Sequence, residues 1–426
     1  MERSGLQQLI EWKRRTDRKP LIINGARQVG KTWILREFAK REYAKEAYVI
    51  CRKNELAEQI FKTDFDVERI ILSLKALTGV DITPNDTLII LDEVQEIPEA
   101  IEALKYFCEN APEYHIAVAG SLLGISLHNG ASYPVGKVNE INLYPMDFGE
   151  FLLANGEAEA YKLLQNRNFD ITNLLHDKYV GLLREYYYVG GMPEVVKKYV
   201  ETKSLNEVRR IQQEILNGYE RDFSKHAPKE QVERIRMVWK SIPSQLFKDN
   251  KKFIYGSLRQ GARAKDFEMA IQWLIDSGLV HKVSRCTKPA LPLDIYEDFS
   301  VFKLYLLDVG LLGAMVKTEP AQVLLSNKVF SEYKGGMTEN YVLQQMKSHG
   351  VSPIYYHKTD DSRLELDFVI QYNAKVLPIE VKAEGNVKAN SLTTLLRNTP
   401  DIVAVRLSML PYKQQEQLYC VPLYAV

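Results

Sequence analysis

Residues 20–40 read PLIINGARQVGKTWILREFAK, and this stretch decides the fold of the first part of the chain. Residues 25–32 within it match G-x-x-x-x-G-K-[ST] between an apolar strand and an amphipathic helix, which is the context that a phosphate-binding loop requires. The glycines allow successive backbone N–H groups to point inward at a polyphosphate, and the start of the helix adds partial positive charge. The alternative is a tight strand-to-helix turn without a ligand.

The same stretch predicts roles for individual side chains. We expect Lys31 to reach the β- and γ-phosphates of a nucleotide and the Thr32 hydroxyl to hold Mg²⁺. The residues expected to contact the nucleotide are Gly25, Arg27, Gln28, Val29, Gly30, Lys31, Thr32 and Trp33.

A second apolar run ends in two acids. Residues 88–93 read LIILDE, which is typical of a buried parallel strand whose carboxyl end projects into a ligand crevice. Asp92 suits a contact with Mg²⁺ through water, and Glu93 could activate the attacking water. Taken alone, a strand that ends in two acids is about as often a solvated strand terminus as part of a ligand site. Beside the glycine loop, it indicates nucleotide chemistry.

The next apolar run, HIAVAG, is followed by Ser121. Its hydroxyl is expected to sense the γ-phosphate or to position the attacking water. A serine that merely caps the following segment is an equal alternative.

Composition indicates a globular, cytoplasmic protein. The 426 residues suggest two or three domains, and 46% apolar with 26% charged residues is ordinary for a chain that buries a core. A net charge of +1 excludes a histone-like or polybasic protein. The four scattered cysteines argue against a disulfide scaffold or a zinc site. No apolar run approaches the roughly 18 residues needed to cross a bilayer, so no membrane partner is expected.

The order of apolar runs predicts an α/β fold in four parts. In residues 1–151, strands alternate with helices, which predicts a parallel sheet covered by helices. Residues 152–227 have helical periodicity alone and predict a helical lid. Residues 228–316 predict helices followed by a small hairpin. Residues 317–426 contain strands again, with a junction predicted at the glycine-rich stretch 333–337.

The last hundred residues carry an acid pattern of their own. If the strands that contain Asp367 and Glu380 are neighbours, their carboxylates come together and suit one or two Mg²⁺ ions. Lys382 lies on the same face as Glu380 and could hold an attacking water or steady a pentavalent phosphate, while Glu339 would add an acid from the preceding helix. The pattern resembles the PD-(D/E)xK nuclease fold, although the proline expected before Asp367 is absent. A solvated, charged strand face is the alternative.

A basic stretch lies in the middle of the chain. From Phe223 to Lys265 there are eleven Lys or Arg residues and three acids, a charge of 11 − 3 = +8. The helices followed by DFEMAIQWLIDSGLVHKV resemble a winged helix-turn-helix, in which the second helix would enter a DNA groove. Double-stranded DNA is therefore the expected partner, since basic charge would meet its phosphates. A solvated basic face or an interdomain contact is the alternative.

The segments RKPLIINGARQVGKT, LIILDEVQEIP, AVAGSLLG, LYPMDFGEF and YVGGMPEVV occur in this order, followed by KLYLLDVGLLGAM, KGGMTENYVLQQM and ELDFVI. This order resembles a group of prokaryotic AAA-type P-loop ATPases related to the archaeal ATPase branch, which carry a C-terminal domain of unknown function. The resemblance implies ATP as the nucleotide and Mg²⁺ as the metal. It assigns the family's functional residues to Lys31, Thr32, Asp92, Glu93 and Ser121.

This sequence departs from the family's pattern at one position before the LYP segment. Many members have Gly-Arg before the strand that precedes LYP, where this chain has Gly136 and Lys137. Lysine cannot form arginine's bidentate fork, so no arginine finger is assigned.

Three functional hypotheses follow. The first is an ATP-hydrolysing protein coupled to DNA through the winged-helix and nuclease-like parts. The second is a nucleotide-dependent switch or interaction module without nuclease activity. The third is an ATP-dependent DNA endonuclease. A homo-oligomer is left open.

Overall fold

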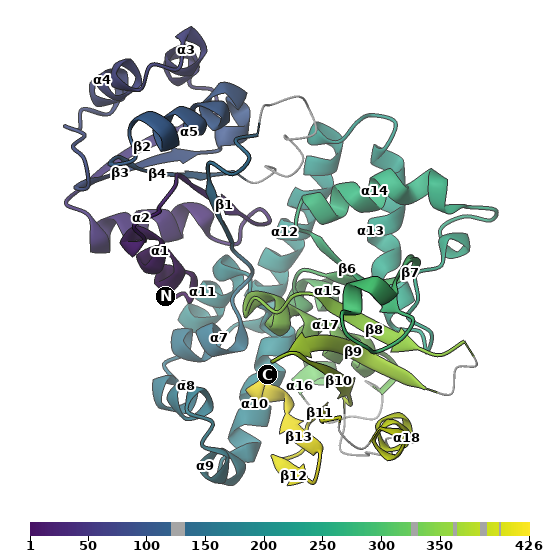
Figure 1. Cartoon of the computed structure of the whole chain (residues 1–426). Helices are drawn as coiled ribbons and strands as arrows, with labels where there is room; N and C mark the ends of the chain where they lie inside the picture. The colour runs from purple at the N-terminus through teal and green to yellow at the C-terminus, as the bar shows by residue number, and fades with distance from the viewer. Residues whose placement is uncertain (121–132, 325–330, 361–363, 384–389, 400–401) are drawn as a thin grey trace. The chain divides into compact units, whose positions relative to one another are not determined.

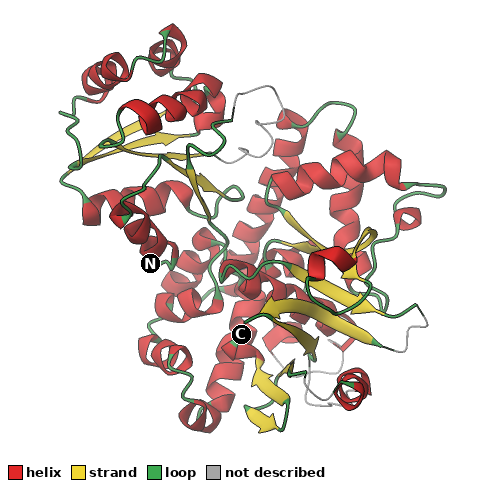
Figure 2. Ribbon diagram, viewed as in Figure 1, coloured by secondary structure: helices red, strands yellow, loops and turns green. Residues whose placement is uncertain are grey.

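The computed structural model describes residues 1–120, 133–324, 331–360, 364–383, 390–399 and 402–426. The chain divides into two compact units, of which the first comprises residues 1–144 with 276–278 and the second residues 145–275 with 279–426 (Figure 1). Each unit combines a β-sheet with several helices (Figure 2).

The first unit is built on a five-stranded sheet in the order β2-β3-β4-β1-β5, in which every neighbouring pair is parallel. The strands are β1 (Leu21–Asn24), β2 (Lys45–Ile50), β3 (Thr87–Asp92), β4 (His115–Ala119) and β5 (Asn139–Asn142). The helices are α1 (Gly5–Arg14), α2 (Lys31–Glu42), α3 (Glu55–Thr63), α4 (Val67–Thr78), the 3-10 helix η1 (Val94–Glu96) and α5 (Pro98–Asn110). The apolar runs at 21–23, 88–91 and 115–119 are strands, and the prediction of an α/β fold with a parallel sheet is confirmed.

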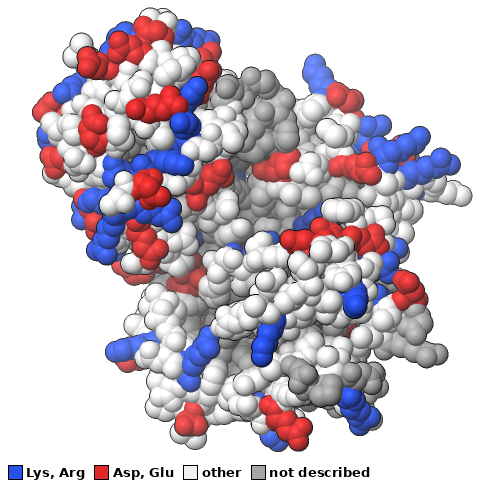
Figure 3. Space-filling view, in the orientation of Figure 1, with Lys and Arg blue, Asp and Glu red and all other residues white. Residues whose placement is uncertain are grey.

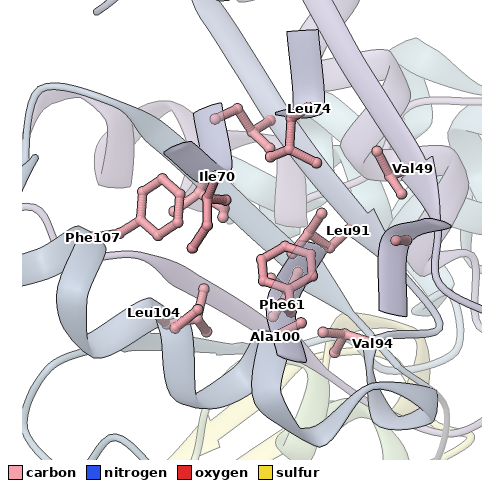
Figure 4. Close-up of a cluster of buried hydrophobic side chains, with 14 of the residues drawn as sticks. Val49, Phe61, Ile70, Leu74, Leu91, Val94, Ala100, Leu104 and Phe107 are labelled. Carbon is pink, nitrogen blue, oxygen red and sulfur yellow. The ribbon is translucent and has the colours of Figure 1, made fainter. Parts of the chain in front are cut away.

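Apolar side chains from three helices cover one side of this sheet. Figure 4 shows Phe61 of α3 beside Leu91 of β3, with Leu74 of α4 and Phe107 of α5 in the same cluster of buried side chains. All four are at most 1% exposed, and burying a side chain of this size contributes about 1.5–3 kcal/mol. Every residue of β3 is buried, which explains its uninterrupted apolar sequence.

Strand order positions the candidate site. Strand β4 lies between β1 and β3, so the loops that follow these three parallel strands leave the same edge of the sheet. Ligands of open α/β sheets bind outside the carboxyl ends of the strands. The glycine loop after β1 and the acids at the end of β3 are therefore brought to one edge.

The second unit contains a helical segment and an eight-stranded mixed sheet, in the order β12-β13-β11-β10-β9-β8-β6-β7. The strands are β6 (Val280–Cys286), β7 (Glu297–Leu306), β8 (Ile354–Lys358), β9 (Glu365–Tyr372), β10 (Lys375–Val381), β11 (Ala404–Ser408), β12 (Lys413–Gln415) and β13 (Leu418–Pro422). The helices are α7 (Phe148–Ala154), α8 (Ala158–Gln165), α9 (Phe169–Leu174), α10 (His176–Val189), α11 (Pro193–Thr202), α12 (Leu205–His226), α13 (Val232–Leu246), η3 (Tyr255–Ser257), α14 (Ala264–Asp276), η4 (Leu293–Tyr296), α15 (Val309–Met315), α16 (Pro320–Leu324), α17 (Ser331–Ser348), α18 (Asn390–Asn398) and η6 (Leu423–Ala425).

A buried carboxylate joins two of the sequence segments quoted above. Asp308 is fully buried and accepts hydrogen bonds from the backbone N–H of Gly191 at 2.6 Å and of Leu311 at 2.9 Å. A Cβ on Gly190 would lie 2.3 Å from Asp308 Oδ1, so only glycine fits there. Burial raises the pKa of Asp308 to about 6, against the lowering effect of these N–H donors. This network ties the α10–α11 turn to the start of α15.

Two details differ from expectation. The hairpin β6–β7 was expected to be small, but β6 also pairs in parallel with β8, with Arg285 opposite Tyr356, so the hairpin extends the C-terminal sheet. The glycine-rich stretch 333–337 lies inside α17 instead of forming a break. Its glycines serve close packing, because a Cβ on Gly336 would come within 2.6 Å of the Leu246 carbonyl oxygen.

Candidate functional site

The loop between β1 and α2 depends on residues with unusual backbone conformations. Gly25 has φ 142°, Gln28 φ 69° and Gly30 φ 96°. A Cβ on Gly25 would approach the backbone oxygen of Leu143 to 2.2 Å, so this position requires glycine. No side chain caps the N-terminus of α2 at Gly30, and the orphan N–H groups of its first turn favour an anion.

The side chain of Lys31 is hydrogen-bonded to the backbone of the β1–α2 loop. Its side chain is buried, and its Nζ donates hydrogen bonds to the carbonyl oxygens of Gly25 and Ala26, each at 2.8 Å. Burial lowers the pKa of Lys31 to about 8, an effect that the negative charges of Glu93 and Asp92 oppose. The ammonium group is thus positioned beside the turn and close to both acids.

Asp92 is surrounded by hydroxyl groups. Its Oδ2 accepts hydrogen bonds from Thr32 Oγ1 and from the Tyr48 hydroxyl, both at 2.8 Å, and its Oδ1 accepts one from the Glu93 backbone N–H at 3.0 Å. Among the described residues, no lysine or arginine forms an ion pair with it. A carboxylate and a hydroxyl in contact form an oxygen set that suits Mg²⁺.

Glu93 occupies the left-handed region of backbone space. Its φ of 54° is unusual for a glutamate, and its Oε2 accepts a hydrogen bond from Gln95 Nε2 at 2.5 Å. Strained backbone of this kind is concentrated at functional sites. The structure brings Lys31, Thr32, Asp92 and Glu93 together at the edge expected from the sequence.

The other predicted contact residues have different environments. Val29 is fully buried, so its backbone is the part that can face a ligand, whereas Gln28 and Trp33 are exposed. Trp33 lines a groove of about 710 Å³ that runs from Thr32 along α2 to the start of β2. Arg27 is partly exposed.

Two further positions named in the sequence concern the same site. Ser121 lies outside the described residues. Lys137, at the position where the family often has arginine, forms an ion pair with Glu109 at 2.9 Å.

Sequence reasoning missed Tyr48 and Gln95. Tyr48 lies in β2, 44 residues before Asp92, and Arg36 lies over its ring at 4.9 Å. Nothing in the strand sequence distinguishes this tyrosine from a core residue. Gln95 lies two residues after Glu93, so its position in the sequence could have indicated a contact with the acid pair.

The C-terminal acids lie in the second unit, on the elements expected. Asp367 in β9 and Glu380 in β10 are on adjacent antiparallel strands, and Glu339 is in α17. Glu339 is buried and contacts Lys251, Lys303 and the Tyr305 hydroxyl. Burial alone would raise the pKa of Glu339, but the two lysines hold it well below its usual value.

The other two acids have separate partners. Asp367 Oδ2 accepts a hydrogen bond from the backbone N–H of Val381 at 2.7 Å, and burial together with the Glu339 charge raises the pKa of Asp367. Glu380 forms an ion pair with Lys382 at 3.0 Å and lies 3.7 Å from Arg406 Nε. In the part of the chain that the structure describes, no group of three or more His, Cys, Asp or Glu side chains is arranged to hold a metal ion.

Comparison with known families agrees with this geometry for the first unit. Residues 17–152 match the family described as AAA domain. This segment is a P-loop domain of the AAA type. Beyond the AAA domain, residues 180–322 match a domain of unknown function (DUF8612), and residues 334–425 match another (DUF4143).

Solved structures of other proteins resemble this chain at low sequence identity. A Walker-type ATPase of Pyrococcus abyssi is 14% identical, with a TM-score of 0.47 over 74% of this chain and 95% of its own. The RuvB Holliday junction branch migration motor of Thermotoga maritima is 11% identical, with a TM-score of 0.31 over 66% of this chain and 89% of its own. No curated protein matches the sequence. Within the described residues, no helix combines the length and apolar character that a membrane crossing needs.

Proposed function

We propose that this protein binds ATP with Mg²⁺ and hydrolyses it at the carboxyl edge of the parallel sheet. The observation that carries the proposal is the hydrogen bond between Thr32 Oγ1 and Asp92 Oδ2, beside the buried Lys31. The residues fit the cofactor: open N–H groups at the start of α2 suit phosphates, and the Thr32–Asp92 pair suits a hard cation. Mg²⁺ bound to ATP would neutralise charge that develops on the transferring phosphoryl group.

Each side chain has a distinct task in this proposal. Lys31 would exchange its hydrogen bonds to the Gly25 and Ala26 carbonyls for bonds to the β- and γ-phosphates, and Thr32 and Asp92 would hold Mg²⁺. Glu93 orients the attacking water and takes up its proton. The proposed nucleotide contacts of residues 25–33 and the sensor role of Ser121 complete the site.

Measurements of ATP binding and steady-state phosphate release test the proposal. Lys31→Ala should weaken ATP binding and abolish turnover, since it removes the only buried ammonium group that the proposal assigns to the phosphates. A wild-type chain that neither binds nor hydrolyses ATP, and that behaves like Lys31→Ala, would overturn it. Tight binding without turnover would favour the nucleotide-dependent switch.

We also propose that residues 228–316 form a winged helix that binds DNA, between a lid at 152–227 and the C-terminal part at 317–426, with 1–151 as the ATPase core. The order of elements supports this. After α13, the Phe253 N–H donates to the Phe302 carbonyl of β7 at 2.8 Å, and η3, α14 and the β6–β7 hairpin follow. Helices that lead through a turn to a candidate recognition helix and a hairpin are typical of this module.

Charge supports the same assignment. Arg259, Arg263 and Lys265 are exposed at the start of α14 and in the loop before it, and Lys and Arg side chains gather in that region in Figure 3. Lys251, counted in the basic stretch, instead contacts Glu339 and is not available to a phosphate.

Binding to a DNA duplex as a function of salt concentration tests the DNA proposal. Changing Arg259, Arg263 and Lys265 together to alanine should weaken binding and reduce the salt slope by about 3, one for each DNA phosphate that is no longer neutralised. The control changes three other exposed lysines of the second unit, Lys178, Lys197 and Lys203, to alanine. Equal weakening in both variants, or no binding by the wild type, would contradict the proposal.

A further inference from the structure

Two lysines enter the C-terminal acid cluster from elements that do not carry its acids. Lys251 comes from the loop after α13 and donates a hydrogen bond to Glu339 Oε1. The Tyr305 hydroxyl donates to Glu339 Oε2 at 3.0 Å, and Lys303 Nζ in β7 lies 3.6 Å from the same oxygen. Both carboxylate oxygens of Glu339 are therefore occupied by groups of the chain itself.

Lys303 lies within the cluster. It is 1% exposed, and its Nζ is 3.6 Å from both Glu339 Oε2 and Glu365 Oε1 and 4.7 Å from the centre of the Tyr356 ring. A buried ammonium group is tolerated when acids compensate its charge, and here two carboxylates do so. A divalent cation bound by Glu339 would lie beside this ammonium group, where like charges repel.

The remaining predicted metal ligands are also engaged. Asp367 Oδ2 accepts the Val381 N–H at 2.7 Å. Glu380 has Lys382 at 3.0 Å and Arg406 at 3.7 Å, so Lys382 contacts a carboxylate instead of an open space for water. The residues present therefore do not fit the metal that the nuclease resemblance implies.

Glycines in α17 make room for this arrangement. A Cβ on Gly336 would lie 2.6 Å from the Leu246 carbonyl oxygen, and one on Gly335 would lie 3.5 Å from Lys251 Nζ. Any larger residue at position 336 would push the end of α13 away from α17. Since Lys251 follows α13 by five residues, the glycine pair allows its loop to reach Glu339.

We infer that Lys251 and Lys303 supply the positive charge that a divalent cation would supply in a nuclease, and that the acid cluster is a metal-independent ionic centre. It fastens the loop after α13 to α17 and β7, and it does not cleave phosphodiester bonds. This inference is independent of the ATPase proposal, because it concerns residues of the second unit alone.

Metal binding by the full chain tests the inference directly. The measurement is a Mn²⁺ titration followed by electron paramagnetic resonance, without nucleotide and in a Thr32→Ala background, so that the glycine loop does not contribute a site. We expect no stoichiometric Mn²⁺ site with a dissociation constant below about 1 mM. We also expect the protein to unfold at the same temperature in EDTA and in Mn²⁺. One site per chain that Asp367→Asn or Glu380→Gln removes would overturn the inference, as would Mn²⁺-dependent nicking of DNA that either variant abolishes.

A reverse experiment removes the internal cations. Changing Lys251 and Lys303 together to methionine should lower the unfolding temperature by about 5 °C or more, and Mn²⁺ should restore part of this loss, because the acids then lack compensation. The control, Lys178→Met, removes an exposed lysine that pairs with Glu157. A double variant as stable as this control would overturn the inference.

A charge exchange keeps the test decisive if the double methionine variant does not fold. The exchange Lys251→Glu with Glu339→Lys retains one positive and one negative charge at the same two positions. We expect it to unfold at a higher temperature than either single change. Single variants that are as stable as the exchange would count against an ionic centre.

Discussion

At the end of β3, Asp92 accepts hydrogen bonds from the hydroxyl groups of Thr32 and Tyr48, whereas in the second unit Glu339 accepts them from Tyr305 and from the ammonium group of Lys251. Both regions place acids close to a lysine. In the first, Lys31 donates to backbone carbonyl oxygens, so its charge is not used to neutralise Asp92 by contact. In the second, the lysines contact the acids directly.

The two regions differ in the groups that compensate the negative charge of their carboxylates. A carboxylate surrounded by hydroxyl groups retains its affinity for a hard cation. A carboxylate already in contact with ammonium groups would have to give up those partners first, and buried ion pairs are costly to break. Two similar acid patterns in one sequence thus lead to opposite expectations for metal binding.

The largest expected effect tests the first region. Glu93→Gln should lower the turnover number for ATP by about 100- to 1,000-fold while ATP still binds, because the proposed general base is lost and the phosphate loop is intact. Phosphate release and ATP binding measured on the same sample check this. Glu159→Gln, an exposed change in α8, serves as the control. Turnover within about twofold of the control would exclude Glu93 as the base.

The second prediction tests the other region. Lys303→Met should reduce the free energy of unfolding by about 3 kcal/mol, because it leaves the buried Glu339 and the half-buried Glu365 with less compensation. Urea denaturation measures the loss. Lys178→Met breaks an exposed ion pair and should cost less than about 1 kcal/mol. Similar losses in both variants would mean that the cluster is not a special ionic centre.

The third prediction concerns the hydroxyl groups around Asp92. Tyr48→Phe should raise the Mg²⁺ concentration needed for half-maximal ATP turnover by about tenfold, since a partner that orients a metal ligand is removed. Tyr43→Phe is a matched control, because the Tyr43 hydroxyl contacts His115 instead. An unchanged Mg²⁺ requirement would show that Tyr48 plays a structural part alone.

The smallest effect is a dependence on pH. Burial lowers the pKa of Lys31 to about 8, and the protonated form is the one that binds phosphates. Raising the pH from 7 to 8.5 should therefore weaken ATP binding by about fourfold, as the ammonium group loses its proton. Dissociation constants across this range check the prediction, and Lys31→Ala should remove the dependence. A flat profile in the wild type would contradict it.

Local sequence was sufficient to predict the features that depend on residues close together in the chain. The central strands β1, β3 and β4 of the first sheet were predictable because buried parallel strands are continuous apolar runs, and the phosphate loop was predictable because its glycines and lysine are neighbours in sequence. The strands that bear Asp367 and Glu380 were also found to be neighbours. The extension of the C-terminal sheet by β6 and β7 was missed, because strand partners distant in sequence leave no periodic signal.

By itself, the sequence determined the parallel sheet, the phosphate loop and the identity of the acids in both regions. The tertiary structure alone decided what surrounds those acids. Tyr48 reaches Asp92 from 44 residues away, and Lys251 reaches Glu339 from 88 residues away. The physical reason is that a carboxylate's affinity for a metal depends on the charges within a few ångströms of it, and these charges come from elements that only folding brings together.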